Sequence, residues 1–381
     1  MISRREVLKM SSAGAFALAA ARATKLMAGA MPTNAAPAAP PDLRRLTTAD
    51  LLALPKLKPA SAIKRTHHTR TFTLVLAPAM VVPLPGHSVQ LRTVNGIAPG
   101  PVLRMTEGDD VEVTVVNRLA QSTSIHWHGI PVPFPMDGVA MISQQPIGTG
   151  QQFVYRWVAP QAGTYMYHSH YNDMEQADSV FGMIIVDPQN PAREPRYDVD
   201  VPIAVTSIDW EPARNIEAQA VLANSMLMPV MAVNPKADPN PGMGDAMERM
   251  DMVEYWCFNG KTFPATEPIR VKRGNLVRVR FANITHMTHP MHLHGHWFRW
   301  IAQDGVPLPE PLAMNTIPVD PGRTIDIDFI ANNPGVWPLH CHIISHMVDN
   351  KDVMSGLVTA IVYDGYTLPT MMQPYQTTTK M

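Results

Sequence analysis

Short stretches of alternating apolar and polar residues run through most of the chain. Residues 111–115 and 276–280 alternate with a period of two, as do residues 153–157 and 325–329. A period of two places successive side chains on opposite faces of a strand, so each stretch predicts a half-buried β-strand. Glycine and proline separate the stretches. The pattern predicts an all-β protein built from Greek-key sandwich or barrel domains.

The second half of the chain repeats the first. A shift of 166 residues aligns Gly108 with Gly274, and a shift of 172 residues aligns Gly163 with Gly335. The two shifts differ by six residues, and we place this difference in a loop, where insertions are tolerated. The same shifts superpose four His-x-His pairs, namely His126/His128 on His292/His294 and His168/His170 on His340/His342. The repeat predicts a duplicated β domain.

The length of 381 residues suits two domains of about 150 residues each and leaves little room for a third. We expect a signal peptide over 1–30, an Ala/Pro-rich leader arm over 31–65, a first domain over 66–190, a second domain over 191–365 with a Met-rich insert over 211–252, and a C-terminal tail over 366–381.

The first residues have the composition of an export signal. Arg4 and Arg5 precede a mildly apolar run over 13–21 that is too short to span a bilayer. Paired arginines in this position resemble a twin-arginine signal. Small residues at 28–30, or alternatively at 21–23, offer a cleavage site. We expect a periplasmic or otherwise exported protein with no membrane association after processing; the alternative is a chance arginine pair ahead of a membrane anchor.

The overall composition excludes several classes of protein. The 31 basic and 32 acidic residues give a net charge of −1, which argues against a nucleic-acid partner. Only two cysteines, Cys257 and Cys341, are present, so the chain cannot be a disulfide scaffold. Proline is frequent at 37 residues, which disfavours long helices and suits short strands joined by turns.

The four His-x-His pairs predict a metal cluster. Residues i and i+2 of a strand share a face, so each pair aims two imidazoles at one point. Histidine is the commonest metal ligand among side chains. One such pair is weak evidence, but four pairs at equivalent places in a duplicated domain indicate several metal ions.

Cys341 predicts a second kind of metal site. It lies between His340 and His342, so its side chain points to the opposite face of the strand. Together with His289 and His346 it supplies one thiolate and two imidazoles, the trigonal ligand set of a blue-copper electron-transfer site. In the first copy, the equivalents of His289, Cys341 and His346 are Thr123, Ser169 and Met174. Only the second domain therefore has this site.

The four histidine motifs resemble those of the multicopper oxidases, in the same order along the chain. They are His126-Trp127-His128-Gly129, His168-Ser169-His170, the run from His289 to Gly295, and the run from His340 to His346. The resemblance covers residues 66–365 and is to the two-domain, laccase-like type. It implies two cupredoxin-like domains and four copper ions per active unit.

The resemblance also assigns the ligands. It implies that His289, Cys341 and His346 bind type 1 copper, that His126 and His292 hold type 2 copper, and that the type 3 pair is held by His128, His168, His170, His294, His340 and His342. Type 1 copper would take electrons from a donor, and Cys341 would pass them through His340 or His342 to the cluster, where O2 is reduced to water. Asp137 matches an acidic position that delivers protons in the family; its alternative role is that of a turn residue before Gly138.

The axial position of the type 1 site departs from the family pattern. The usual spacing falls on Lys351, which is not a plausible ligand. Residues 347–354 look like a loop insertion before Ser355-Gly356-Leu357. Leu357, which would not coordinate, and Met354, a weak thioether ligand, are the two candidates, with Leu357 favoured by its place before a strand. Met347 replaces a carboxylate that some relatives carry after the last histidine.

The remaining histidines and the other cysteine are expected to be surface or structural residues. They are His67, His68, His87, His286, His296 and Cys257, the last as a buried free thiol.

A two-domain chain raises a question of assembly. Two-domain relatives form homotrimers in which each cluster lies between the first domain of one chain and the second domain of the next. Such a head-to-tail contact closes into a ring. We therefore expect a homotrimer.

The sequence is compatible with two classes of electron donor. Seven methionines lie between residues 226 and 252, and Met287, Met291 and Met347 neighbour the type 1 motifs. Soft thioethers suit Cu(I), which favours a periplasmic cuprous oxidase in copper tolerance, whereas methionine also serves as flexible core filler. The other donor class is phenols or aromatic amines. A copper nitrite reductase or a non-enzymatic copper-binding protein are weaker alternatives.

Overall fold

The computed structural model describes residues 63–171, 180–210, 253–348 and 354–369. All of them belong to one compact unit, Asp50–Met381. The predicted signal peptide, almost all of the leader arm, the Met-rich insert, Lys351 and most of the C-terminal tail lie outside the described residues. None of the described helices has the length and apolar character needed to cross a membrane.

The first copy of the repeat forms two four-stranded sheets. Their strand orders are β2-β1-β4-β6 and β3-β8-β7-β5. The strands are β1 Thr69–Leu84, β2 His87–Val94, β3 Leu103–Thr106, β4 Asp110–Asn117, β5 Ile125–His128, β6 Gln152–Val158, β7 Gly163–Ser169 and β8 Phe181–Asp187. Two 3-10 helices, η3 Phe134–Met136 and η4 Pro191–Arg193, lie in the connections.

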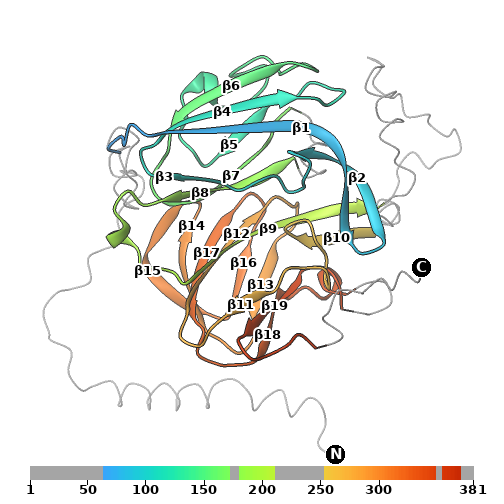
Figure 1. Cartoon of the computed structure of the whole chain (residues 1–381), viewed down its shortest axis with the longest axis vertical. Helices are drawn as coiled ribbons and strands as arrows, with labels where there is room; N and C mark the ends of the chain where they lie inside the picture. The colour runs from blue at the N-terminus through green and yellow to red at the C-terminus, as the bar shows by residue number, and fades with distance from the viewer. Residues whose placement is uncertain (1–62, 172–179, 211–252, 349–353, 370–381) are drawn as a thin grey trace, which may run out of the picture. The chain divides into compact units, whose positions relative to one another are not determined.

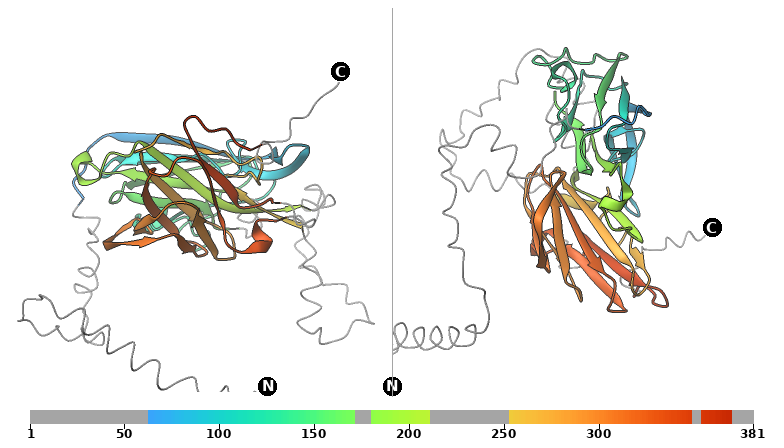
Figure 2. Two further views of the ribbon diagram at one scale, coloured as in Figure 1. Left: turned by 90° about the horizontal axis from the view of Figure 1, so that it is seen from below. Right: turned by 90° about the vertical axis from the view of Figure 1, so that its left-hand side faces the viewer.

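The second copy forms a six-stranded and a five-stranded sheet. Their orders are β10-β9-β12-β17-β14-β15 and β11-β19-β18-β13-β16. The elements are β9 Val199–Trp210, β10 Val253–Phe258, β11 Ile269–Val271, β12 Leu276–Asn283, β13 His289–Leu293, β14 Phe298–Gln303, β15 Val306–Met314, β16 Thr316–Val319, β17 Thr324–Ile330, β18 Val336–Cys341, η5 Ile344–His346 and β19 Val358–Tyr363. The all-β prediction is confirmed, and the two copies lie next to each other in Figures 1 and 2.

The duplication is visible in the strand pairing. β1 pairs in parallel with β4, as β9 does with β12, and β5 pairs antiparallel with β7, as β13 does with β18. The alternating stretch over 111–115 lies in β4 with its valines buried, as the period of two predicts. Each copy has its own core, built around Trp127 in the first and around Phe281 in the second. The fold therefore presents two equivalent strand pairs, and two of the His-x-His pairs lie on or directly at the ends of each.

Strand β7 of the first copy joins β12 and β17 of the second through a buried polar cluster. Thr164 Oγ1 donates to Asp326 Oδ1 over 2.7 Å, and Arg280 Nη1 donates to Thr164 Oγ1 and to Asp326 Oδ2 over 3.0 and 3.1 Å. Thr324 Oγ1 donates to the Thr164 carbonyl over 2.8 Å. Gly163 packs so closely on Gly305 that an added Cβ would lie 2.6 Å from the Gly305 Cα. Paired buried charges and backbone contact fix how the two copies meet.

Candidate metal centres

Strands β13 and β18 present different ligands on their two faces. Met291 lies opposite Cys341 in the register of this pair, and His292 lies opposite His340. Because side chains alternate along a strand, Cys341 points into the core while His340 points to the other face. Cys341 is fully buried. One strand therefore supplies ligands to two sites.

The core face brings together one thiol and two imidazoles. The Sγ atom of Cys341 lies 3.7 Å from Nδ1 of His289 and 3.6 Å from Nδ1 of His346, and the two Nδ1 atoms are 3.1 Å apart. His289 begins β13 and His346 ends η5, and both side chains are buried. These three donor atoms surround one point, and two imidazoles with one thiolate form the donor set that copper takes in trigonal electron-transfer sites. The residues present fit a copper ion.

Burial sets the protonation of these ligands in the metal-free protein. Burial, aided by the neighbouring His346 and His286, lowers the pKa of His289 to about 3, and burial lowers that of His346 to about 4. Both imidazoles are therefore neutral near pH 7. Burial also raises the pKa of the Cys341 thiol to about 11. A metal ion bound here must displace the thiol proton.

The two candidates for the axial position differ in burial. Leu357 is fully buried in the same core as Cys341, and its carbonyl accepts a hydrogen bond of 3.0 Å from the Cys341 N–H. Its own N–H donates to the His346 carbonyl over 2.9 Å. Met354 is 43% exposed. This geometry favours Leu357.

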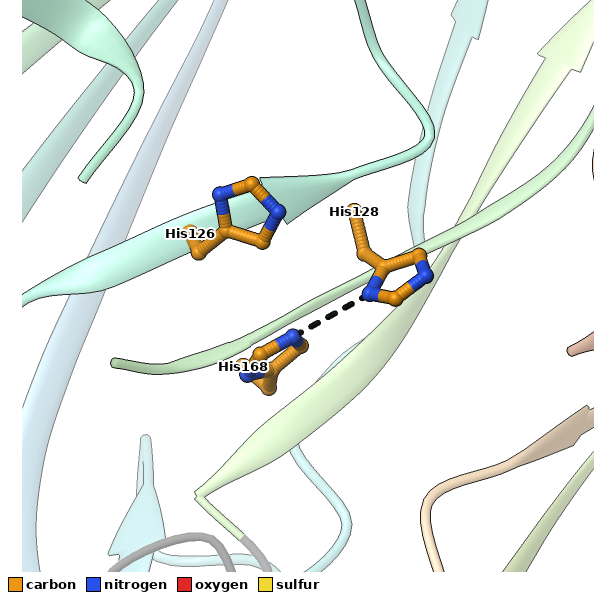
Figure 3. A group of neighbouring side chains, drawn as sticks. All are labelled: His126, His128 and His168. Carbon is orange, nitrogen blue, oxygen red and sulfur yellow. Dashed lines mark hydrogen bonds between the residues drawn. The ribbon is translucent and has the colours of Figure 1, made fainter. Parts of the chain in front are cut away.

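The first histidine cluster consists of His126 and His128 on β5, His168 on β7 and His170 directly after β7. His126 and His128 project from the same face of β5, and His168 lies opposite His126 on β7 (Figure 3). His128 Nδ1 is 3.3 Å from His168 Nε2, and one ring nitrogen of each of these three histidines lies within 4.8 Å of the others. The His170 ring lies 5.4 Å from that of His126. All four imidazoles converge, as the spacing predicts.

The second histidine cluster, His292, His294, His340 and His342, repeats this arrangement. His294 Nε2 lies 2.9 Å from His340 Nε2, and the ring of His292 lies 5.6 Å from that of His340 and 5.5 Å from that of His342. Burial is the largest cause of the lowered pKa of His294 and His340, and neighbouring histidines add to it. In the first cluster burial lowers the pKa of His168 to about 4. These imidazoles are kept neutral, the state that binds metal.

Backbone carbonyls orient several of these rings. His126 Nδ1 donates to the Asp137 carbonyl, and His292 Nδ1 donates to the Asn315 carbonyl, each over 2.7 Å. His168 and His340 make bonds of the same length to the carbonyls of Ser169 and Cys341. A carbonyl only accepts, so Nδ1 carries the proton and Nε2 is left as the metal-binding atom. Asn315 was not found from the sequence, because its backbone oxygen carries no residue-type signal.

The two histidine clusters do not meet within the described part of the chain. Every ring contact among the eight histidines joins members of one cluster. His128 instead approaches Gly322 of the second domain, where an added Cβ would lie 3.6 Å from the imidazole. Each cluster is therefore a separate set of four imidazoles.

Asp137 lies beside the first cluster. Its backbone carbonyl accepts the hydrogen bond from His126 Nδ1. Its side-chain Oδ1 atom lies 3.5 Å from the same nitrogen, and the side chain is partly exposed. A carboxylate at this distance can exchange a proton with water or with groups near His126.

Cys257 and His296 lie outside the three ligand sets, and His286 neighbours His289 and His346 without belonging to their set. Cys257 is a buried free thiol whose pKa burial raises far above its usual range. His296 is buried and bonds to the hydroxyl of Tyr363 over 2.6 Å. Trp256, which sequence reasoning missed, packs against His346 in a tilted arrangement with ring centroids 4.2 Å apart, and it also contacts the His289 ring.

Comparison with known proteins gives one family. Family profiles described as multicopper oxidase match residues 77–191 and 235–357. The solved structure of the multicopper oxidase mgLAC is 31% identical with a TM-score of 0.65, covering 79% of this chain and 88% of that one. The predicted cupredoxin-like fold agrees with this similarity and is confirmed.

Curated relatives include longer proteins. Copper resistance protein A of Escherichia coli is 43% identical over 34% of this chain and 21% of its own length. Laccase-1 of Cryptococcus neoformans var. grubii is 32% identical over 67% of this chain and 40% of its own length. The chain thus spans less than half of either relative.

Proposed function

Because the chain belongs to the multicopper oxidase family, we propose that it is an exported, laccase-like oxidase that couples oxidation of a small donor to reduction of O2 to water. The observation that carries this proposal is the position of Cys341 between His340 and His342. The thiol belongs to the trigonal set, and both neighbours belong to the second histidine cluster. Copper bound at these sets would supply one-electron transfer at the trigonal site and O2 reduction at the clusters.

The chain's own residues support this chemistry in three ways. The peptide units of Cys341 join the trigonal set covalently to His340 and His342, which gives a short through-bond path. Burial keeps the imidazoles of His289 and His346 neutral and excludes water from the thiol. Asp137, beside His126, is placed to hand on protons that water formation consumes.

We also propose that the active unit is a homotrimer with four copper ions for each chain. The support is that each histidine cluster alone offers four imidazoles, whereas the eight together match a trinuclear site. Large apolar side chains stand exposed in the segments that follow the histidine pairs along the chain: Phe134, Met141, Ile142 and Tyr171 in the first domain, Trp297 and Ile344 in the second. Where such residues form a contiguous patch, they mark protein interfaces. The first cluster of one chain would meet the second cluster of its neighbour.

A mixing experiment tests the assembly. One chain carries His168→Gln and His170→Gln, the other His340→Gln and His342→Gln. If clusters form between chains, each variant is inactive alone, and trimers formed by mixing both regain part of the O2 uptake. A copper-loaded, active protein that has a monomeric mass in light scattering contradicts the proposal.

Two donor classes are proposed, and one experiment separates them. Phenols or aromatic amines fit the similarity to Laccase-1; Cu(I) fits the similarity to copper resistance protein A and the thioethers of Met287 and Met354, which are 37% and 43% exposed. Oxygen uptake is measured with each donor on copper-loaded protein, before and after deletion of residues 226–252. Loss of Cu(I) turnover alone on deletion supports a cuprous oxidase. No uptake with any donor, together with no blue absorption band, contradicts the oxidase and supports a copper-binding protein.

A further inference from the structure

The imidazole of His289 makes a hydrogen bond to a buried threonine, Thr285, through its Nε2 atom. Nε2 of His289 lies 2.7 Å from Oγ1 of Thr285, on the side of the ring away from Cys341. Thr285 is 5% exposed and His289 is fully buried, so water does not compete for this bond. The ring therefore has a protein partner at Nε2 and faces the trigonal site with Nδ1.

The partners of the threonine hydroxyl decide which way this bond runs. Thr285 Oγ1 also lies 2.8 Å from Asn283 Oδ1 and 3.1 Å from the Met287 carbonyl, and both of these oxygens only accept. The side-chain nitrogen of Asn283 donates to the carbonyls of Met287 and Val319 over 2.8 Å each, so the atom that faces Thr285 is the side-chain oxygen. The single hydroxyl proton therefore goes to one of the two oxygens. Toward His289 the hydroxyl can only accept, so His289 must donate from Nε2.

The duplication provides an internal comparison. Asn117 makes the same bonds in the first domain, donating to two carbonyls over 2.8 Å each and accepting from the N–H two residues on. The residue that donates this N–H is Leu119, which is equivalent to Thr285, and the equivalent of His289 is Thr123. The asparagine is thus common to both copies, since it shapes the turn. The threonine hydroxyl is present only in the copy that has the histidine to be held.

We infer that Thr285 is a positioning residue of the trigonal site: its hydroxyl holds His289 as the Nε2–H tautomer and aims the Nδ1 lone pair at the point shared with Cys341 and His346. This inference rests on the proposed function, because it takes these three residues as copper ligands. His346 is positioned differently, by a tilted ring contact with Trp256. The two imidazoles of the site therefore have unequal support.

Removal of the hydroxyl should weaken the metal site while the Asn283 bonds that shape the turn remain. It also removes the oxygen to which the Met287 N–H donates over 3.3 Å. Thr285→Val keeps the shape of the side chain and the bond from the 285 N–H to Asn283. Loss of a partner behind a metal-binding histidine costs about 10- to 100-fold in metal affinity. The reduction potential should rise, because an imidazole without its acceptor is a weaker donor to Cu(II).

Three variants test the inference. Thr285→Val, Thr285→Ser and Thr288→Val are compared with the wild type by copper titration of the blue band and by redox titration. Thr288 adjoins His289 in sequence, but its hydroxyl donates to Asp320 over 2.7 Å and so provides the matched control. Thr285→Val should bind type 1 copper about 10- to 100-fold more weakly with a raised potential. Thr285→Ser and Thr288→Val should match the wild type.

A second measurement does not depend on copper. Nitrogen-15 NMR of the histidine-labelled, copper-free protein, with the signal assigned through His289→Gln, should show the proton on Nε2. A proton on Nδ1, or a Thr285→Val variant that retains wild-type affinity and potential, overturns the inference. If the wild type takes up no blue copper at all, the proposed function fails, while the NMR result still judges the tautomer.

Discussion

Cys341 of β18 lies directly opposite Met291 of β13, and one residue earlier His340 lies opposite His292. The first pair faces the core and the second faces the histidine cluster. Two metal sites are thus built from the two faces of one strand pair. The first domain has the cluster face alone, because Ser169 stands at the position equivalent to Cys341.

Replacement of Cys341 by serine should abolish the trigonal site. A hydroxyl is a poor substitute for the thiolate that copper requires there, so the blue band should disappear and donor-driven O2 uptake should fall to background. The visible spectrum and an oxygen electrode measure both. Cys257→Ser is the matched control, since this buried free thiol lies outside the ligand set and donates to the Tyr255 carbonyl over 3.5 Å. A blue band that survives in Cys341→Ser contradicts the ligand assignment.

Replacement of Leu357 by methionine should lower the reduction potential of type 1 copper. The side chain is fully buried near Cys341, and a thioether there can act as a weak axial ligand that stabilises Cu(II). Because leucine and methionine have similar volumes, the fold should lose less than about 1.5 kcal/mol. Redox titration checks the shift. The opposite result, in which Met354→Leu changes the potential and Leu357→Met does not, would assign the axial position to Met354.

Asp137→Asn should slow the oxygen reaction while leaving electron uptake intact. The variant keeps the backbone carbonyl that accepts from His126 but removes the carboxylate 3.5 Å from that ring. Loss of a positioned proton donor typically costs about 10²- to 10⁴-fold in rate. Stopped-flow bleaching of the blue band without O2 should be unchanged, and O2 uptake should fall. Asp110→Asn, at a surface carboxylate paired with Arg65, serves as the control; equal rates in the two variants would make Asp137 a turn residue.

The copper-free protein should lose stability as the pH falls from about 7 to about 5. His168, His289 and His346 have pKa values of about 4, 3 and 4 in the folded state. In the unfolded chain they titrate near about 6.5, so below that pH the unfolded state binds more protons than the folded one. On going from pH 7 to pH 5, each of these three histidines should lower the free energy of unfolding by about 2 kcal/mol.

Denaturant unfolding at several pH values measures this dependence. His168→Gln should reduce the slope by about one proton between pH 5 and 6, because it removes one of the groups that charge only on unfolding. An unchanged slope in this variant would show that His168 titrates alike in both states.

The amino-acid sequence by itself determined the fold class, the duplication and the grouping of the ligands. These follow from local geometry, because the period of two fixes which side chains share a strand face. His126 and His128 can be assigned to one face of their strand, and Cys341 and His340 to the two different faces of theirs, before any tertiary contact is known. The repeat adds an independent check, since Thr123 and Ser169 stand where the second domain has His289 and Cys341.

Tertiary structure decided the surroundings of the ligands. The carbonyl of Asn315 and the hydroxyl of Thr285 orient histidines through contacts that depend on how loops return to the strands. The choice of Leu357 over Met354 depends on which side chain the core encloses. The separation of the two histidine clusters depends on how β7 packs against β12 and β17 through the hydrogen bonds of Thr164 with Arg280 and Asp326. These are long-range packing relations, and neither residue type nor strand period encodes them.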